Sequence, residues 1–219
     1  MIKNLTAILL FLLMTFKSYA GGDHPEWNIS VTPQYMFNNA LKMDFERRLG
    51  KTDWIGISGD YYLGPINQDN SANGPNSTLV RYNTTHQDDY IRGEGITIDD
   101  KWFFSQGFFI GFGYGYEKLG IDYQDNTWVP TQQNGLTYYH FTLTNGKLNI
   151  NRNDGFFGFG YAGKPLSGIH VDWFLGGGYR TVNSSSSLGI GYRDYTRTTF
   201  DFQYPGIHPI FTMTVGYMF

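Results

Sequence analysis

Residues 108–117 read FFIGFGYGYE, and this stretch decides the fold class. Its even-numbered positions are all aromatic or aliphatic, whereas positions 111, 113 and 115 are glycine and position 117 is glutamate. Successive side chains of a β-strand point to opposite faces. The stretch therefore predicts a strand with one strongly aromatic face and one face of small or polar residues.

The same alternation recurs along most of the chain. Strand candidates lie near residues 26–37, 40–50, 53–64, 89–104, 107–118, 154–164, 167–181 and 208–219. Their apolar faces are rich in aromatic residues, and the opposite faces are rich in Gly, Ser and Thr. The segment 89–104 carries two phases, which a bulge at Gly93–Gly95 would reconcile, because a bulge shifts the alternation by one residue.

A water-soluble sandwich would alternate in the same way, with its apolar faces turned inward. The inverted arrangement of a membrane barrel is favoured here, because small residues suit a narrow lumen and aromatic residues suit interfacial girdles. The girdle at the periplasmic face is predicted to contain Trp27, Trp54, Trp102 and Phe108, and the external girdle Tyr35, Tyr61, Tyr114 and Tyr179.

The connections between the candidate strands also sort by length. Short ones at 51–52, 105–106 and 164–167 would lie on the periplasmic side, and long ones near 65–88, 119–153 and 182–207 would lie outside, with a tight hairpin at 38–39. This arrangement is typical of outer-membrane barrels. The sequence thus predicts an all-β, eight-stranded antiparallel up-and-down transmembrane β-barrel.

One stretch leaves the strand number open. Asn145-Gly146, within 119–153, suits the type I′ turn of a hairpin. We interpret it as neighbouring strands running on beyond the membrane, and a barrel of ten strands is the alternative.

Residues 1–20 have the pattern of a cleaved secretory signal. Lys3 precedes an apolar run from Leu5 to Phe16, and the segment ends at Ala20. The run is too short for a helix across a bilayer of ~30 Å. Residues 21–219 would then form the barrel of an exported protein.

Composition narrows the possible functions. The chain of 219 residues has no cysteine, which excludes disulfides, thiolate zinc sites and cysteine nucleophiles. A net charge of −3 argues against nucleic acid as a partner, because such binding needs a basic surface.

The last eight residues, TMTVGYMF, resemble the C-terminal signal of bacterial outer-membrane proteins. Tyr217 and Phe219 resemble the aromatic pair that the barrel-assembly machinery recognises during insertion. The chain as a whole resembles the small outer-membrane barrels of the OmpA-transmembrane, OmpX and OmpW kind. This resemblance implies the bacterial outer membrane as the location and outer-membrane lipid and lipopolysaccharide as neighbours, and it brings no catalytic motif.

Charged residues alternate with the apolar ones and are predicted to face the lumen. On the lipid side Lys or Arg at mid-depth would each cost roughly 2–4 kcal/mol. The predicted network contains Lys42, Asp44, Glu46, Arg48, Asp60, Glu117, Asp172 and Arg180. A structural network of paired charges is favoured over a narrow ion pathway.

The long connections carry aromatic residues among Asn, Gln, Ser and Thr, a composition that suits glycan or protein surfaces. The binding candidates are Tyr82, Tyr123, Trp128, Tyr138, Tyr139, Tyr192 and Tyr195. The alternative is that these aromatic residues only pack the connections into extended strands.

Catalytic and metal sites are not expected. Neither His140 with Thr142 nor His86 with Ser77 or Asp88 forms a nucleophile, base and orienting acid. The acidic clusters Asp88-Asp89 and Asp122-x-x-Asp125-Asn126 lack the spacing of a calcium loop.

The sequence therefore predicts a non-enzymatic structural or interaction barrel, without cofactor or metal, that binds external proteins or glycans. A narrow porin-like channel is the alternative, and a lipid A-modifying enzyme is the less favoured one.

Overall fold

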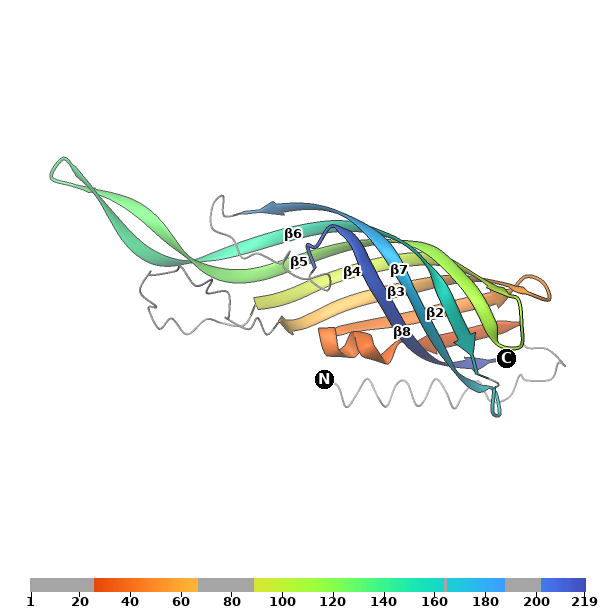
Figure 1. Cartoon of the computed structure of the whole chain (residues 1–219). Coiled ribbons are helices and arrows are strands. Elements are labelled where there is room, and N and C mark those ends of the chain that lie inside the picture. Colours follow the sequence, from red (N-terminus) through yellow and green to blue (C-terminus); the bar gives the residue numbers. More distant parts are fainter. Residues whose placement is uncertain (1–25, 67–88, 164, 188–201) are drawn as a thin grey trace, which may run out of the picture.

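The computed structural model describes residues 26–66, 89–163, 165–187 and 202–219. They form a closed antiparallel barrel in which every strand pairs with its sequence neighbours and β1 closes onto β8 (Figure 1). The fold is therefore the predicted eight-stranded up-and-down barrel. The predicted signal segment lies outside the described residues. Among those described, no helix is long and apolar enough to cross a bilayer.

The strands differ greatly in length. Their bounds are β1 Trp27–Val31, β2 Ala40–Arg48, β3 Asp53–Ile66, β4 Asp89–Phe103, β5 Phe108–Gln133, β6 Leu136–Ala162, β7 Ile169–Ser186 and β8 Gly206–Met218. Three short turns, at 49–52, 104–107 and 163–168, lie at one end of the barrel, here called the turn end. The opposite end, called the hairpin end, carries the β5–β6 hairpin, which extends far past the other strands (Figure 1).

The first strand is shorter than predicted. It ends at Val31, and Pro33–Asn38 forms a 3₁₀ helix, η2, in place of strand and tight hairpin. Pro33 lacks the amide hydrogen that a ladder needs, and its fixed φ suits the first helical position. The prediction that Tyr35 belongs to an outward girdle was therefore wrong: its side chain packs against the buried cluster at the hairpin end.

The β5–β6 turn also differs from the prediction. It lies at Asn134-Gly135, where both residues have positive φ, and not at Asn145-Gly146. Asn145 and Gly146 are mid-strand and pair with Gln124 and Tyr123. Both Asn-Gly dipeptides suit a type I′ turn, so local sequence alone could not choose between them. As interpreted, β5 and β6 run on as one pair past the ends of the neighbouring strands, and the ten-stranded alternative was wrong.

The apolar face of the strands changes from the outer to the inner wall partway along the barrel. In β5, Tyr114 and Tyr116 point outward and are exposed, whereas Leu119 and Ile121 point inward and are fully buried. The same change occurs in β6 between Phe157 on the outside and Ile150 on the inside. The turn end thus has an apolar exterior, and the hairpin end has an apolar interior.

This change of face produces a compact hydrophobic cluster inside the hairpin end. Its buried members are Ala40, Tyr62, Ile91, Leu119, Ile121, Tyr123, Leu148 and Ile150. Burial of such side chains stabilises by roughly 1.5–3 kcal/mol each. The hairpin end is therefore built like a water-soluble barrel placed directly on top of a membrane-type barrel.

The change of face also explains the two phases of residues 89–104. Ile91 is completely buried, and Ile96 is 49% exposed, yet β4 alternates without interruption and pairs in continuous register with β3 and β5. The predicted bulge at Gly93–Gly95 was therefore wrong. The apolar residues move from one wall to the other while the strand geometry stays regular.

Phenylalanine rings and glycines fill part of the lumen together. The rings of Phe109, Phe156 and Phe174 point inward and lie over glycines of neighbouring strands, including Gly160 and Gly113. Phe109 and Phe174 stack with their centroids 6.4 Å apart. A glycine-lined wall is what allows such large rings inside a barrel of eight strands.

Two glycines of β6 provide a matched test of this packing. A Cβ at position 160 would overlap the Phe109 ring, whereas a Cβ at position 155 would meet nothing within 4 Å. We expect Gly160→Ala to lower the free energy of unfolding by about 1–3 kcal/mol, and Gly155→Ala to leave it nearly unchanged. Urea unfolding of the two folded variants measures the difference. Equal effects would show that the rings do not rest on this wall.

The aromatic residues predicted for the girdles divide into two groups. Trp102, Phe108, Tyr61, Tyr114 and Tyr179 are exposed on the outer wall, and Trp27 is partly buried there, stacked on Phe45 at 5.0 Å. Trp54 is only 8% exposed, because its position in β3 shares the inward parity of Ser58. Its assignment to an outer girdle was wrong.

The C-terminal residues close the barrel. The Phe219 carbonyl accepts the Trp27 amide hydrogen at 3.0 Å, and the Phe219 amide donates to the Trp27 carbonyl at 2.9 Å. Tyr217, within β8, stacks against Phe219 with centroids 6.3 Å apart. Both aromatic residues of the predicted assembly signal therefore lie at the seam between β1 and β8.

Candidate functional site

A layered network of charges lies in the lumen. It occupies the half of the barrel next to the turn end, here called the turn half. Alternation places Asp44 and Glu46 of β2, Asp60 of β3, Glu117 of β5, and Asp172 and Arg180 of β7 on the inner wall, where all six are buried. Lys42, also inward, lies with its side chain only 15% exposed. These are seven of the eight residues that the sequence placed in a lumen network.

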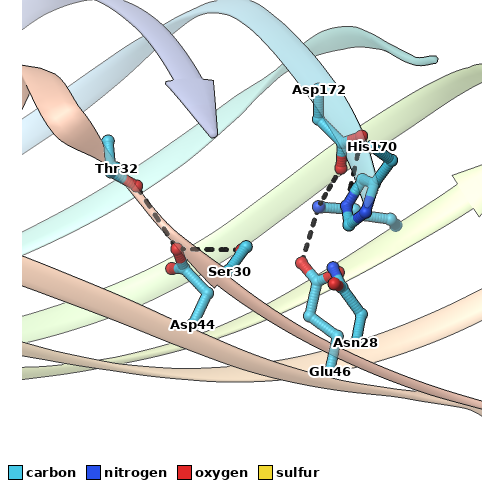
Figure 2. Close-up of polar contacts among 8 residues, drawn as sticks. Asn28, Ser30, Thr32, Asp44, Glu46, His170 and Asp172 are labelled. Atoms are coloured by element: carbon cyan, nitrogen blue, oxygen red, sulfur yellow. Dashed lines mark hydrogen bonds and ion pairs between the residues drawn. The ribbon is translucent and has the colours of Figure 1, made fainter. Parts of the chain in front are cut away.

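Lys101 of β4 lies at the centre of the layer nearest the turn end. Its ammonium lies 2.6 Å from Glu46 Oε1 and 3.4 Å from Asp172 Oδ2, so one cation joins three strands across the lumen. Asn28 Nδ2 donates to the other Glu46 oxygen at 2.8 Å, and His170 Nε2 lies 3.6 Å from Asp172 (Figure 2). The Lys101 ammonium also lies 5.2 Å from the Phe109 ring centroid, a cation–π distance.

The Asp44 carboxylate accepts hydrogen bonds from hydroxyl groups, and no ion pair to it is found among the described residues. Thr32 Oγ1 and Ser30 Oγ donate to its Oδ2 at 3.3 and 3.4 Å, and Figure 2 shows both contacts meeting at the same carboxylate. One step nearer the hairpin end, Lys42 lies 3.7 Å from Asp60 and over the Tyr35 ring at 5.3 Å.

Arg152 of β6 and Arg180 of β7 form the layer below the hydrophobic cluster. Arg152 Nη2 lies 2.5 Å from Glu117 Oε2 and donates to the Tyr62 hydroxyl, on the far side of the lumen, at 3.1 Å. Asp154 lies 2.7 Å from Arg180 Nε and 3.8 Å from Arg152 Nε. The layer is thus a chain of ion pairs from β7 through β6 to β5, and the hydrogen bond to Tyr62 extends it to β3.

Charges and rings together enclose a lumen cavity of about 380 Å³. Its lining includes Lys42, Lys101, Arg152, Phe109, Phe156 and Phe174. The walls are polar enough to hold water. Two side chains of this lining, Lys101 and Arg152, also make contacts across the lumen.

The position of Arg48 differs from the prediction that it belongs to the lumen network. It lies at the turn end, and its guanidinium donates to the carbonyls of Gly50 and Lys51 at 2.7 and 2.9 Å. It therefore caps the β2–β3 turn and takes no part in the ion pairs of the lumen. Its position at the last residue of β2 leaves it beyond the carboxylates, and the turn carbonyls are closer.

The sequence reasoning missed several members of the network. They are Asn28, Asp99, Lys101, Arg152, Asp154 and His170. The signal for Lys101 was present, since it alternates with the outward Ile98 and Trp102, but the supposed bulge obscured the phase. Arg152 was missed because β6 was expected to begin only at residue 154.

The residues predicted to bind an external ligand fall into three groups: exposed, buried, and outside the described part of the chain. Tyr138 and Tyr139 are 52% and 64% exposed near the tip of the β5–β6 hairpin. Tyr123 is only 4% exposed and its hydroxyl lies 2.7 Å from Ser186 Oγ, so the prediction that it is an external binding residue was wrong. Tyr82, Tyr192 and Tyr195 lie outside the described residues, as does the side chain of Trp128.

The candidate catalytic residues show no triad geometry where they are described. His140 Nδ1 lies 3.0 Å from Thr131 Oγ1 on the exposed hairpin, and no acidic partner of His140 is found among the described side chains. His86, Ser77 and Asp88 lie outside the described residues. Nor do three His, Asp or Glu side chains of the described part group closely enough to hold a metal ion.

Comparison with known proteins gives similar solved structures only. No family model matches the chain, and no curated protein matches its sequence. The structure is similar to CarO of Acinetobacter baumannii, with 15% identity, a TM-score of 0.41, and coverage of 90% of this chain and 98% of that one. It is also similar to CarO2 of Acinetobacter baumannii, with 14% identity, a TM-score of 0.42, and coverage of 89% and 98%.

Proposed function

We propose that this chain is a non-enzymatic barrel of the bacterial outer membrane that binds an external glycan through its β5–β6 hairpin. The lumen network, in this proposal, is structural and keeps the barrel closed. The observation that carries the binding function is the projecting hairpin, defined as residues 124–146. The membrane placement is supported by the outer wall.

The outer wall of the turn half carries an apolar belt, interrupted in β4 by Asp100, which pairs with Ile55 and Phe112. In β5 it runs from Phe108 to Tyr116, and the same belt continues through Phe159, Leu175 and Phe211 on the following strands, all exposed. A transmembrane strand needs about 9–11 residues, which matches the span in β5. In water such a belt would be a large aggregation surface, whereas in a bilayer it is the favourable arrangement.

The projecting hairpin stands clear of the barrel. Within the described residues, β4 pairs with β5 only as far as Asp122, and β7 pairs with β6 only as far as Leu148. Between these limits β5 and β6 pair with each other, and Figure 1 shows the ribbon extending away from the other strands. Such a structure presents side chains to the exterior without contributing to barrel closure.

The composition of this hairpin favours an uncharged ligand. Residues 126–146 contain no Asp, Glu, Lys or Arg, and they are rich in Thr, Asn and Gln. Leu136, Tyr138 and Tyr139 are more than half exposed. Aromatic rings stack on sugar rings and amide or hydroxyl groups bond to their hydroxyls, so a neutral saccharide fits this surface.

Substitution of the two tyrosines tests the proposal. We expect Tyr138→Ser with Tyr139→Ser to weaken retention on a glycan array by about tenfold or more, because both stacking surfaces are lost. Tyr138→Phe with Tyr139→Phe should retain most of the binding, because the rings remain. The array is probed with the folded barrel in detergent. Equal binding by the Ser variant, or no saccharide retained by the unmodified protein, would contradict the proposal.

A narrow channel is the second candidate function, and the lumen cavity is the observation that favours it. The cavity is lined by charges of both signs, and a solute path would pass Lys101 and Arg152. Planar-bilayer recording of the unmodified protein separates the two functions. Steady conductance would favour the channel, and its absence would favour the closed structural lumen.

A further inference from the structure

Three cations lie together on the outer wall, just beyond the apolar belt. They are Arg92 of β4, Lys118 of β5 and Lys147 of β6, and all three are exposed. Lys118 is two residues beyond Tyr116, the last aromatic residue of the belt in β5. Two residues of strand span about 7 Å, which is the thickness of the polar layer on one side of a bilayer.

The register brings the three cations around one glycine. Arg92 pairs with Gly120 across β4 and β5, and Lys118 is the next outward residue of β5 toward the belt. Lys147 pairs with Asp122, and its Cε lies 3.5 Å from the position that a Cβ of Gly120 would occupy. Gly120 thus leaves a surface position without a side chain, and the three positive side chains surround it.

The rest of the wall at this height is uncharged. Beyond the belt, the outward positions of β6 are Asn149, Asn151 and Asn153, and those of β7 are Thr181 and Asn183. On β3 the corresponding position is Leu63. Among the described residues, the cations of the outer wall at the hairpin end are therefore confined to this one sector.

Two carboxylates belong to the same sector. Glu94 pairs with Lys118 in the ladder, and Asp122 Oδ2 lies 3.9 Å from Arg92 Nε. The Arg92 and Asp122 side chains are 68% and 47% exposed, so their attraction is weak. The sector keeps a net positive charge, and its cations remain available to an anion.

We propose that Arg92, Lys118 and Lys147 form a site for the phosphate groups of a phosphorylated glycolipid of the outer leaflet, with its acyl chains lying along the apolar belt. This inference rests on the proposed membrane placement and is independent of the glycan bound by the projecting hairpin. Guanidinium and ammonium groups are the usual protein partners of phosphate. The adjoining Ile96 and Tyr116 supply an apolar surface for the chains directly below.

A pair of charge-matched variants tests this site. Arg92→Gln with Lys118→Gln removes two cations from the sector, and Arg47→Gln with Lys51→Gln removes two exposed cations at the turn end. Binding to the folded protein in detergent is measured with two probes: lipopolysaccharide carrying diphosphorylated lipid A, and the same lipid after enzymatic dephosphorylation. Heat-modified gel mobility confirms that each variant is folded.

The unmodified protein should prefer the phosphorylated lipid. The Arg92/Lys118 variant should bind it about tenfold more weakly, since each basic residue near an anionic lipid surface contributes appreciably, and the Arg47/Lys51 variant should bind normally. Equal weakening by both variants would show a general charge effect and overturn the site. Unchanged binding by the Arg92/Lys118 variant, or no preference for phosphorylated lipid, would also overturn it. The Tyr138/Tyr139 variants should not change these results, so failure of the glycan proposal remains distinguishable.

Discussion

Replacing Lys101 by Met is expected to lower the free energy of unfolding of the barrel by about 3–5 kcal/mol, because it leaves buried carboxylates without their cation. Glu46 and Asp172 are both below 5% exposed and both lie within 3.4 Å of the Lys101 ammonium. Methionine retains most of the lysine volume, so loss of packing contributes little. The measurement is a urea titration of the protein folded in detergent micelles, followed by heat-modified gel mobility.

Two further variants make this result specific. Glu46→Ala should cost less than Lys101→Met, because Lys101 keeps Asp172 as a partner. Lys51→Met, in the exposed β2–β3 turn, should change the free energy of unfolding by less than about 0.5 kcal/mol. A Lys101→Met barrel as stable as the unmodified protein would contradict the structural role of the lumen network.

The fold was predictable because apolar residues alternate with small or polar residues along most of the sequence. Ile110–Tyr116 shows the period of two without interruption, and the sorting of short and long connections gives the direction of the barrel. Seven of the proposed lumen residues follow from the same parity, since a charge that alternates with outward aromatic residues has only the lumen to occupy. No geometric information beyond strand periodicity was needed for these.

What failed was the assumption that the apolar face stays on one wall. Leu119 and Ile121 continue the inward parity of Glu117, but they are apolar and buried. In the proposed membrane placement, the strand has left the lipid-covered region at this point. When the apolar residues of a regular strand move from the outer to the inner wall, their positions in the sequence shift by one residue. A bulge produces the same shift, which is why Gly93–Gly95 was interpreted as one. The same change of wall hid the continuation of β6 and, with it, Arg152.

Other details depended on contacts that sequence does not specify. The choice between Asn134-Gly135 and Asn145-Gly146 is made by the pairing of the entire hairpin, since either dipeptide suits the turn. The burial of Tyr123 likewise depends on Ser186, which lies far along the chain in β7.

The inversion of polarity between Tyr116 and Lys118 predicts where the barrel leaves the membrane. Because the chain contains no cysteine, single cysteines can be introduced along β5 without a background. Phe112 and Tyr116 represent the apolar belt, Asp122 represents the outer wall beyond it, and Ile121 represents the buried cluster. A membrane-impermeant maleimide applied to intact cells reports which of these positions faces external water.

This labelling tests the membrane placement and the change of face together. The expected result is strong labelling at Asp122→Cys, and little or none at Phe112→Cys, Tyr116→Cys and Ile121→Cys. Lipid should protect Phe112→Cys and Tyr116→Cys, and packing inside the hairpin end should protect Ile121→Cys. Labelling of Phe112→Cys as strong as that of Asp122→Cys, in a variant shown to be folded, would contradict a barrel whose turn half lies in the outer membrane.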